Sequence, residues 1–113
     1  MKLVHQQIQY IEFLSNDLTA AKKFYNEAFG WDFTDYGPEY TSFGGDHVAG
    51  GFTIGKPVNG SILVILYSAD LEATLSKVIS AGGKIVHEIF SFPGGRRFHF
   101  TDPDGYELAV WGE

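Results

Sequence analysis

Apolar and polar residues alternate over two segments near the end of the chain, Arg97–Thr101 and Tyr106–Trp111, with Asp102-Pro103-Asp104-Gly105 between them. Proline fixes φ near the value of the first turn position and glycine accepts a positive φ, so these four residues predict a β-hairpin. Alternation places an apolar set on one face of the hairpin: Phe98, Phe100, Leu108 and Val110. The other face carries a mixed set: Arg97, His99, Thr101, Glu107, Ala109 and Trp111. The apolar face should pack against other elements, and the mixed face should meet water or a cavity.

Two other stretches show helical spacing. Apolar residues recur every three or four positions from Leu18 to Phe29, after Asp17 and before Gly30. An aspartate side chain can accept a hydrogen bond from the free N–H groups at a helix start, and glycine commonly follows a helix end. A second stripe begins after Asp70 and stops at Gly82-Gly83. We therefore predict a helix over 18–29 and a second helix after Asp70.

The remaining segments predict strands around these helices. They lie at 8–14, 31–36, 39–43, 48–54, 61–67, 84–89, 97–101 and 106–111. The stretch 91–97, which contains Gly94-Gly95, is predicted to be a mobile loop. Each half of the chain has the order strand, helix, three strands, and Asp17-Leu18 aligns with Asp70-Leu71. Such units cannot bury their apolar faces alone, so the two halves should pack together.

This order predicts a single α+β domain over residues 1–113. The domain consists of two βαβββ modules in tandem, at about 5–55 and 61–113, that form curved mixed sheets with the helices on the outer face. The two sheets should share a concave surface. With 44% hydrophobic residues, the chain is long enough to build one core without disulfides or a structural metal.

Composition excludes several classes of function. The formal charge is −6 and no basic cluster is larger than Arg96-Arg97, so we expect no nucleic-acid binding. No segment approaches the roughly 18 apolar residues of a membrane span, and the first residues lack the apolar core of a secretion signal. The absence of cysteine removes disulfides, thiolate nucleophiles and cysteine-bound metals, and it is consistent with a reducing compartment. We expect a cytoplasmic protein without membrane contact.

Three features together resemble the vicinal oxygen chelate superfamily. They are the βαβββ duplication, the segment DLTAAKKFYNEAFGW at 17–31 and the segment FTDPDGYELAVW at 100–111. That superfamily contains glyoxalase I, extradiol dioxygenases, fosfomycin-resistance transferases and bleomycin-binding proteins. The resemblance implies the fold but not one chemistry, since the same scaffold serves unrelated functions.

The resemblance also implies where a metal would bind. Members that catalyse usually hold a divalent metal with His and Glu on the first and last strands of each half, and these four positions fall here on Tyr10, Gly51, Leu63 and Ala109. None of these residues is a good ligand, since such a cation prefers imidazole and carboxylate donors. We therefore expect no metal and no cofactor.

Seven residues on the concave face are predicted to bind a ligand. They share the parity of the lost metal positions or lie on the mixed face of the hairpin: Tyr10, Glu12, Tyr67, Arg97, His99, Glu107 and Trp111. Apolar walls with a few convergent polar groups are typical of a small-molecule pocket. The resemblance supports His99 further, because fosfomycin-resistance relatives carry a pocket tyrosine at its position.

Each of these residues also has a structural interpretation. Glu12 and Glu107 can be surface carboxylates with Arg97 as their partner, and His99 can be a hydrogen-bonded structural histidine. The aromatic residues can fill the cavity or face a dimer partner. The other histidines, His5, His47 and His87, have no partner at ligand spacing and are interpreted as surface residues, while Arg96 either reaches an anionic ligand or is solvated.

The sequence therefore predicts a small-molecule-binding protein of the glyoxalase/bleomycin-resistance type that works without a metal and forms a homodimer. One alternative is a glyoxalase- or lyase-like enzyme that uses Glu12, Glu107 and His99 as acid–base groups, or a metal held by a rearranged set. Another is a structural or partner-binding domain whose own Tyr and Trp side chains fill the cavity. The sequence assigns no catalytic residue.

Overall fold

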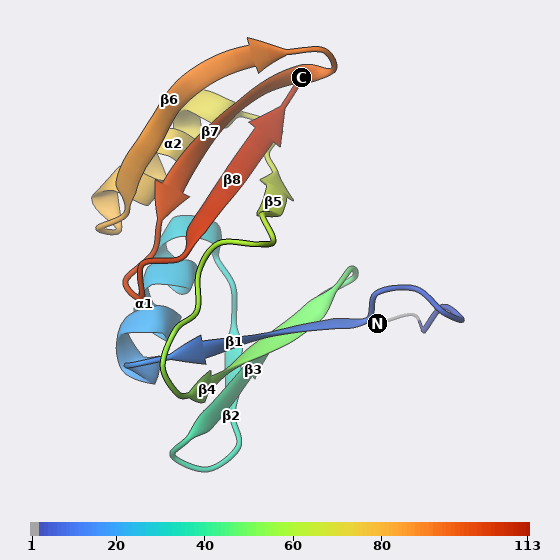
Figure 1. The fold of residues 1–113 in the computed structure, drawn as a ribbon, viewed down its shortest axis with the longest axis vertical. Helices are drawn as coiled ribbons and strands as arrows, with labels where there is room; N and C mark the ends of the chain where they lie inside the picture. The colour runs from blue at the N-terminus through green and yellow to red at the C-terminus, as the bar shows by residue number, and fades with distance from the viewer. Residues whose placement is uncertain (1–2) are drawn as a thin grey trace.

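The computed structural model describes residues 3–113, which form two series of elements with the same order. The first series is β1 (Tyr10–Ser15), α1 (Leu18–Phe29), β2 (Phe33–Asp35), β3 (Tyr40–Phe43) and β4 (Ala49–Ile54). The second is β5 (Val64–Tyr67), α2 (Leu71–Ser80), β6 (Lys84–Phe92), β7 (Gly95–Thr101) and β8 (Glu107–Gly112). Each series builds one four-stranded sheet, in the orders β1-β4-β3-β2 and β5-β8-β7-β6 (Figure 1). The predicted α+β fold of two βαβββ modules is confirmed.

Both helices begin in the same way. The side chain of Asp17 accepts a hydrogen bond from the N–H of Ala20 at 3.1 Å, and that of Asp70 accepts one from the N–H of Ala73 at 3.1 Å. These bonds satisfy donors that a helix start otherwise leaves free. Helix α1 ends at Gly30, whose φ of 76° is the left-handed conformation that glycine adopts without strain. Within residues 3–113, neither helix is long and apolar enough to cross a membrane.

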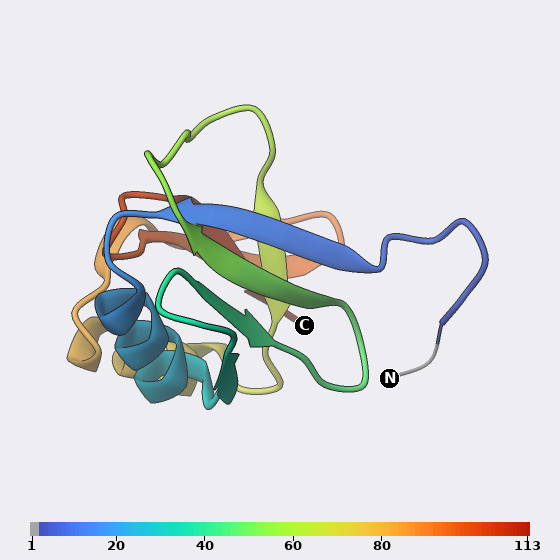
Figure 2. The same cartoon turned by 90° about the horizontal axis from the view of Figure 1, so that it is seen from below.

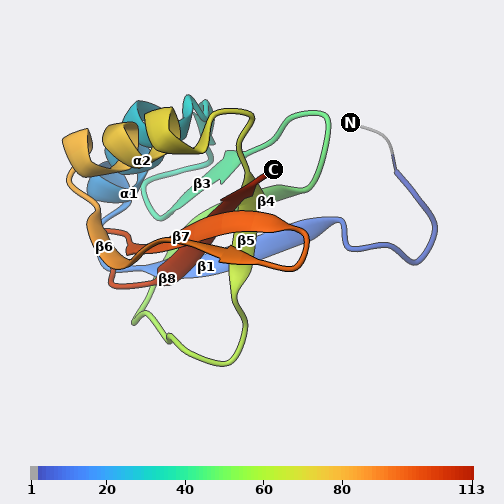
Figure 3. The same ribbon diagram turned by 90° about the horizontal axis from the view of Figure 1, so that it is seen from above.

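The helices cover one side of both sheets. Figures 2 and 3 show α1 and α2 next to each other on the same side of the strands. Helix α1 touches both sheets, because the ring centroid of Tyr25 lies 5.3 Å from that of Phe52 in β4, and that of Phe24 lies 5.9 Å from that of Phe100 in β7. All four rings are buried. One continuous core therefore holds the two modules together, with the helices on the outer face as predicted.

Polar contacts also tie the modules at the turn between β7 and β8. The buried Tyr25 hydroxyl donates a hydrogen bond to Asp102 Oδ2 at 2.7 Å, and the N–H of Asn16 donates to Asp104 Oδ1 at 2.8 Å. The hydroxyl of Tyr106 donates to the carbonyl of Leu14 at 2.9 Å. Burial raises the pKa of the Asp102 carboxyl, although the Tyr25 hydroxyl opposes this effect. The β7–β8 turn is thus fixed to the β1–α1 junction.

The sheet faces opposite the helices are open. In β1 the side chains of Ile11 and Phe13 belong to the core, whereas Tyr10 is 43% exposed. In β5, Ile65 and Tyr67 are exposed while Val64 packs against the core. The alternation predicted for these strands is therefore present. In a single chain, the sheet faces that point away from the helices carry exposed apolar side chains.

The loop predicted at 91–97 is too long, because only the turn within it is present. Strand β6 continues to Phe92, and Phe92 pairs with Gly95 across a tight turn at Pro93-Gly94. The register of β6 against β7 also shifts on either side of His87, first between Ile85 and His87 and then between His87 and Phe90. At each shift β6 has one extra residue relative to β7, and such an extra residue turns the side chains that follow it to the other face of the sheet.

Candidate functional site

The seven predicted site residues fall into two groups on different sheets. Tyr10 and Glu12 lie on β1, and five residues lie on the second sheet: Tyr67 on β5, Arg97 and His99 on β7, and Glu107 and Trp111 on β8. Figure 1 shows the two sheets as separate layers, with the first sheet below and the second above. A single chain therefore gathers five of the seven residues on one sheet.

His99 and Glu107 form a pair on the open face of the second sheet. His99 Nδ1 lies 2.8 Å from Glu107 Oε2, and the histidine side chain is only 9% exposed. The other ring nitrogen, Nε2, is buried and meets no hydrogen-bond partner among residues 3–113. An unmade hydrogen bond at a buried polar atom costs about 1–3 kcal/mol, so this nitrogen is available to a bound group. The partner of Glu107 is His99 rather than the predicted Arg97.

Arg97 instead lies among aromatic rings. Its guanidinium carbon is 5.5 Å from the ring centroid of Phe90 and 5.3 Å from that of Phe92, which are distances typical of cation–π contacts. Among the described residues it forms no ion pair. Arg97 also lines a pocket of about 360 Å³ together with Ile65, Phe92, Gly94 and Trp111. Tyr67 adjoins this pocket, with its ring 5.2 Å from that of Trp111. The pocket has apolar walls and one cation.

Arg96 points to the opposite side of the sheet and is neutralised there. Its guanidinium nitrogens lie 2.5 and 3.3 Å from the carboxylate oxygens of Glu72 in α2. The hydrogen bonds between the two groups lower the pKa of Glu72 and raise the pKa of Arg96. Of the two interpretations offered for Arg96, neither describes this contact, since the residue is ion-paired with the helix.

The open face of the first sheet carries a tyrosine pair. The hydroxyls of Tyr10 and Tyr40 hydrogen-bond to each other, and desolvation together with the neighbouring Tyr10 and Glu12 raises the pKa of Tyr40. The pair covers Gly51: a Cβ at this glycine would lie 2.6 Å from the Tyr10 hydroxyl oxygen and 2.8 Å from the Thr41 carbonyl oxygen. A residue with a side chain larger than the hydrogen of glycine does not fit at position 51 without displacing its neighbours.

The metal centre implied by the resemblance therefore does not fit this chain. Its four positions hold Tyr10, Gly51, Leu63 and Ala109, and the space above Gly51 is taken by tyrosine hydroxyls. Glycine, leucine and alanine side chains supply no ligand atom for a divalent cation. We derive no chemistry from a metal at these four positions.

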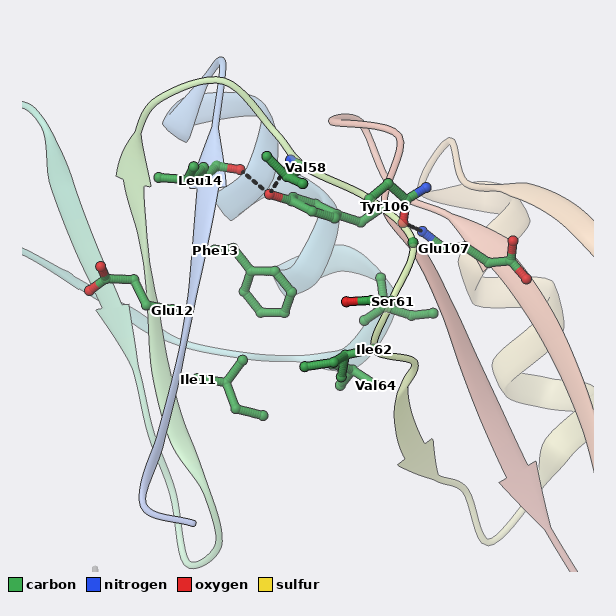
Figure 4. A pocket seen from close by; sticks show the side chains of 13 residues that line it. Ile11, Glu12, Phe13, Leu14, Val58, Ser61, Ile62, Val64, Tyr106 and Glu107 are labelled. Atoms are coloured by element: carbon green, nitrogen blue, oxygen red, sulfur yellow. Dashed lines mark hydrogen bonds between the residues drawn. The ribbon is translucent and has the colours of Figure 1, made fainter.

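A second cavity, of about 430 Å³, lies between the modules. It is lined by β1, by the linker through Val58–Ile62 and by the start of β8, and its walls are mainly apolar. Figure 4 shows Ile11, Phe13 and Ile62 around the cavity, while the carboxylates of Glu12 and Glu107 point away from it on opposite sides. Sequence reasoning missed this cavity, because it placed only Tyr10 and Glu12 of β1 on the concave face. The apolar residues of the linker were the only local signal.

His87 is the other residue that sequence reasoning missed. It is exposed, as expected, but its ring centroid lies 4.9 Å from that of His99, and the two rings are nearly perpendicular. The register shifts around His87 bring it opposite His99 and onto the same face. The interpretation of His87 as a histidine without a partner is therefore wrong.

Comparison with known proteins places this fold among relatives. A curated relative named "Putative glyoxylase CFP32", found in Mycobacterium bovis and Mycobacterium tuberculosis, is 30% identical over 114 residues, which cover 90% of this chain and 44% of the relative. The chain thus spans less than half the length of these relatives. A glyoxalase-related enzyme from Fulvimarina pelagi has a similar structure, with a TM-score of 0.83, 24% identity and coverage of 96% of this chain and 88% of that one.

An antibiotic binding protein from Streptomyces sp. CB03234, TnmS3, is also similar in structure. Its TM-score is 0.73 at 19% identity, and the match covers 98% of both chains. At such identities the two structures show a shared fold. The sequence model of one family matches residues 7–110. The chain belongs to the Glyoxalase/Bleomycin resistance protein/Dioxygenase superfamily.

Proposed function

We propose that this protein binds a small organic molecule on the open face of its second sheet, without the metal centre usual in its superfamily. The pocket formed by Ile65, Phe92, Gly94, Arg97 and Trp111 carries this proposal. Its volume of about 360 Å³ lies within the range of small-molecule sites, which are roughly 300–1,000 Å³ and mostly apolar with a few polar groups.

The residues of the pocket indicate the class of ligand. Trp111 and Phe92 offer aromatic surface, and Arg97 offers a cation with no carboxylate partner among residues 3–113. Guanidinium groups bind carboxylates and other anionic oxygens with paired hydrogen bonds. The ligand we propose is a small organic acid with an aromatic or apolar body. His99 and Glu107 lie on the same strands as Arg97 and Trp111 and complete the polar side of the site.

A thermal-shift screen of aromatic and aliphatic organic acids tests this proposal. A ligand at about 100 times its dissociation constant stabilises the folded state by roughly 2.7 kcal/mol. The affinity of the best hit is then measured by calorimetry for Arg97→Gln and for its control, Arg96→Gln, which removes the same charge from the helix side of the sheet. A hydrogen bond to a charged group contributes about 1.5–3 kcal/mol, so Arg97→Gln should weaken binding at least tenfold and Arg96→Gln should not.

His99→Ala separates a ligand contact from a structural role. If His99 contacts the ligand, its loss weakens binding by about 1 kcal/mol or more. If binding is unchanged while the melting temperature falls, the histidine is structural and leaves the proposed site. Equal losses for the two arginine variants would contradict the pocket, since attraction to surface charge alone would explain the binding.

The second candidate function is a glyoxalase- or lyase-like enzyme. The contact of 2.8 Å between His99 and Glu107 favours it, because a carboxylate that orients a histidine is a frequent acid–base arrangement. Glu12, the third predicted acid–base group, lies on the other sheet. Turnover of α-oxo aldehyde adducts of a thiol by wild type but not by Glu107→Gln would favour the enzyme over the binding protein.

Two further expectations belong to the same proposal. We propose a homodimer in which a second copy covers the open sheet faces, where Tyr10, Ile65 and Tyr67 are exposed. We also propose a cytoplasmic location, which the absence of cysteine supports. The net charge of −6 argues against nucleic acid as a partner.

A further inference from the structure

Three side chains with metal-binding atoms meet on the open face of the second sheet. His87, His99 and Glu107 come from the adjacent strands β6, β7 and β8. Their ligand atoms all lie within 4.8 Å of one another. The register shifts on both sides of His87 place it opposite His99, whereas regular pairing from Ile85 onward would turn it to the helix side. The irregular strand is what completes the cluster.

The state of His99 gives a second, independent indication of a missing partner. The residue is 7% exposed, its Nδ1 contacts Glu107, and its Nε2 is buried without a hydrogen-bond partner among the described residues. A neutral imidazole that meets a carboxylate through one nitrogen presents the other as an electron-pair donor. Carboxylate–histidine pairs of this kind orient and strengthen histidine ligands of zinc.

We propose that His87, His99 and Glu107 form a binding site for a divalent transition-metal ion of the zinc class. Nε2 of His99 and a ring nitrogen of His87 are the two imidazole donors, Glu107 orients His99 from the other side of its ring, and water or another molecule takes the remaining positions of a four-coordinate ion. In a tetrahedral site with bonds of about 2.0–2.1 Å, the ligand atoms are roughly 3.3 Å apart. Glu107 already orients His99 through Nδ1 at 2.8 Å, and the exposed His87 side chain rotates toward Nε2 of His99 to reach the same ion.

This site differs from the metal centre that the superfamily resemblance implies. The expectation of a metal-free protein was based on Tyr10, Gly51, Leu63 and Ala109, and it does not extend to these three residues. His99 pairs in register with Ala109, so the proposed site lies beside one of the lost positions. The proposed metal site shares His99 and Glu107 with the polar side of the organic-acid site, but it includes none of the residues that line the pocket itself.

Zinc titration of the metal-stripped protein tests the site. The purified chain is dialysed against a chelator and then titrated with Zn²⁺ in competition with a chromophoric chelator, with no organic ligand present. We expect one Zn²⁺ per chain. His87→Ala should weaken binding at least tenfold, since changes even in the groups around metal ligands cost 10- to 100-fold. Because His87 is exposed, this variant should fold normally, which circular dichroism checks.

The matched control is His47→Ala, which removes an exposed imidazole from the segment between β3 and β4, outside the cluster. Its zinc affinity should equal that of wild type. Glu107→Gln keeps the size of the side chain and removes its charge, and it should also lose at least tenfold in affinity. Co²⁺ bound to wild type should give the intense visible absorption of a four-coordinate site, and His87→Ala should lose it.

Two results would overturn the proposal. One is the absence of stoichiometric Zn²⁺ binding by wild type. The other is an equal loss of affinity in His47→Ala and His87→Ala, which would indicate adventitious binding to surface histidines. Either result leaves the organic-acid pocket to be judged by its own screen, because Zn²⁺ is the only probe in this titration.

Discussion

The substitution Tyr25→Phe removes one oxygen atom from the contact between the two modules. The Tyr25 hydroxyl donates to Asp102 Oδ2 at 2.7 Å, and both side chains are buried, at 0% and 6% exposure. The other oxygen, Oδ1, keeps its hydrogen bonds from the N–H groups of Asp104 and Tyr106, each at 2.9 Å. The phenylalanine ring fills the same space, so only the bond to Oδ2 is lost.

The expected loss of stability in Tyr25→Phe follows from that single hydrogen bond. Hydrogen bonds to charged groups contribute about 1.5–3 kcal/mol, and a buried carboxylate oxygen left unpaired recovers none of this from water. We therefore expect the free energy of unfolding at neutral pH to fall by about 2 kcal/mol. With a urea m value of roughly 2 kcal/mol/M, the midpoint should fall by about 1 M at unchanged m.

Urea unfolding followed by circular dichroism measures this change. Tyr36→Phe is the matched control, because it removes the same atom from a tyrosine that is 64% exposed, and it should change stability by less than about 0.5 kcal/mol. A Tyr25→Phe midpoint indistinguishable from that of the control would refute the reasoning. In that case the bond between Tyr25 and Asp102 would add nothing to the packing of the rings.

The pH dependence gives a second check on the same bond. Burial raises the pKa of Asp102, so the folded chain holds this proton more tightly than the unfolded one. The contribution of Asp102 to stability is thus complete below the unfolded pKa of about 3.9 and is lost as pH rises through the folded pKa. The Tyr25 hydroxyl favours the charged form of Asp102. Tyr25→Phe should therefore lower the free energy of unfolding most at neutral pH and less near pH 4. A loss independent of pH would contradict this.

Two further outcomes are expected. Light scattering at micromolar concentration should give the mass of two chains, since the exposed faces of Tyr10 and Tyr67 need a cover, and a mass of one chain, 12.5 kDa, would contradict the dimer. Gly51→Ala should lower the free energy of unfolding by about 1–3 kcal/mol, because its Cβ would lie 2.6 Å from the Tyr10 hydroxyl oxygen. Adding Tyr10→Phe to this variant should restore part of the lost stability. Equal stability of Gly51→Ala and wild type would show that the site is not crowded.

The features that sequence predicted well are local ones. Helix α1 spans Leu18–Phe29 as expected, because its cap at Asp17 and its end at Gly30 act within one turn of the helix. The order of elements and the apolar faces of β1, β7 and β8 follow from alternation in the same way. The strand predicted at 61–67 begins only at Val64, since pairing with β8 starts there.

The features that sequence could not predict depend on distant parts of the chain. His87 joins His99 through a shift of register that no local pattern around residues 84–92 reveals. The cavity between the modules depends on how the linker runs relative to β1, which the linker residues alone do not determine. The ligand-binding roles of the seven residues predicted on the concave face remain predictions. The structure places five of these residues on the second sheet and two on the first, so a ligand bound on a single sheet can contact at most five of them.

The contacts at the β7–β8 turn also bear on how the chain folds. They join Leu14 to Tyr106, Asn16 to Asp104 and Tyr25 to Asp102, so each closes a loop of most of the chain. Such closures are entropically costly and make folding slow. During synthesis, the apolar side of α1 that packs on Phe100 has no partner until the last hairpin leaves the ribosome. The first module alone therefore leaves this apolar side of α1 uncovered, and uncovered apolar surface favours aggregation until β7 packs on it.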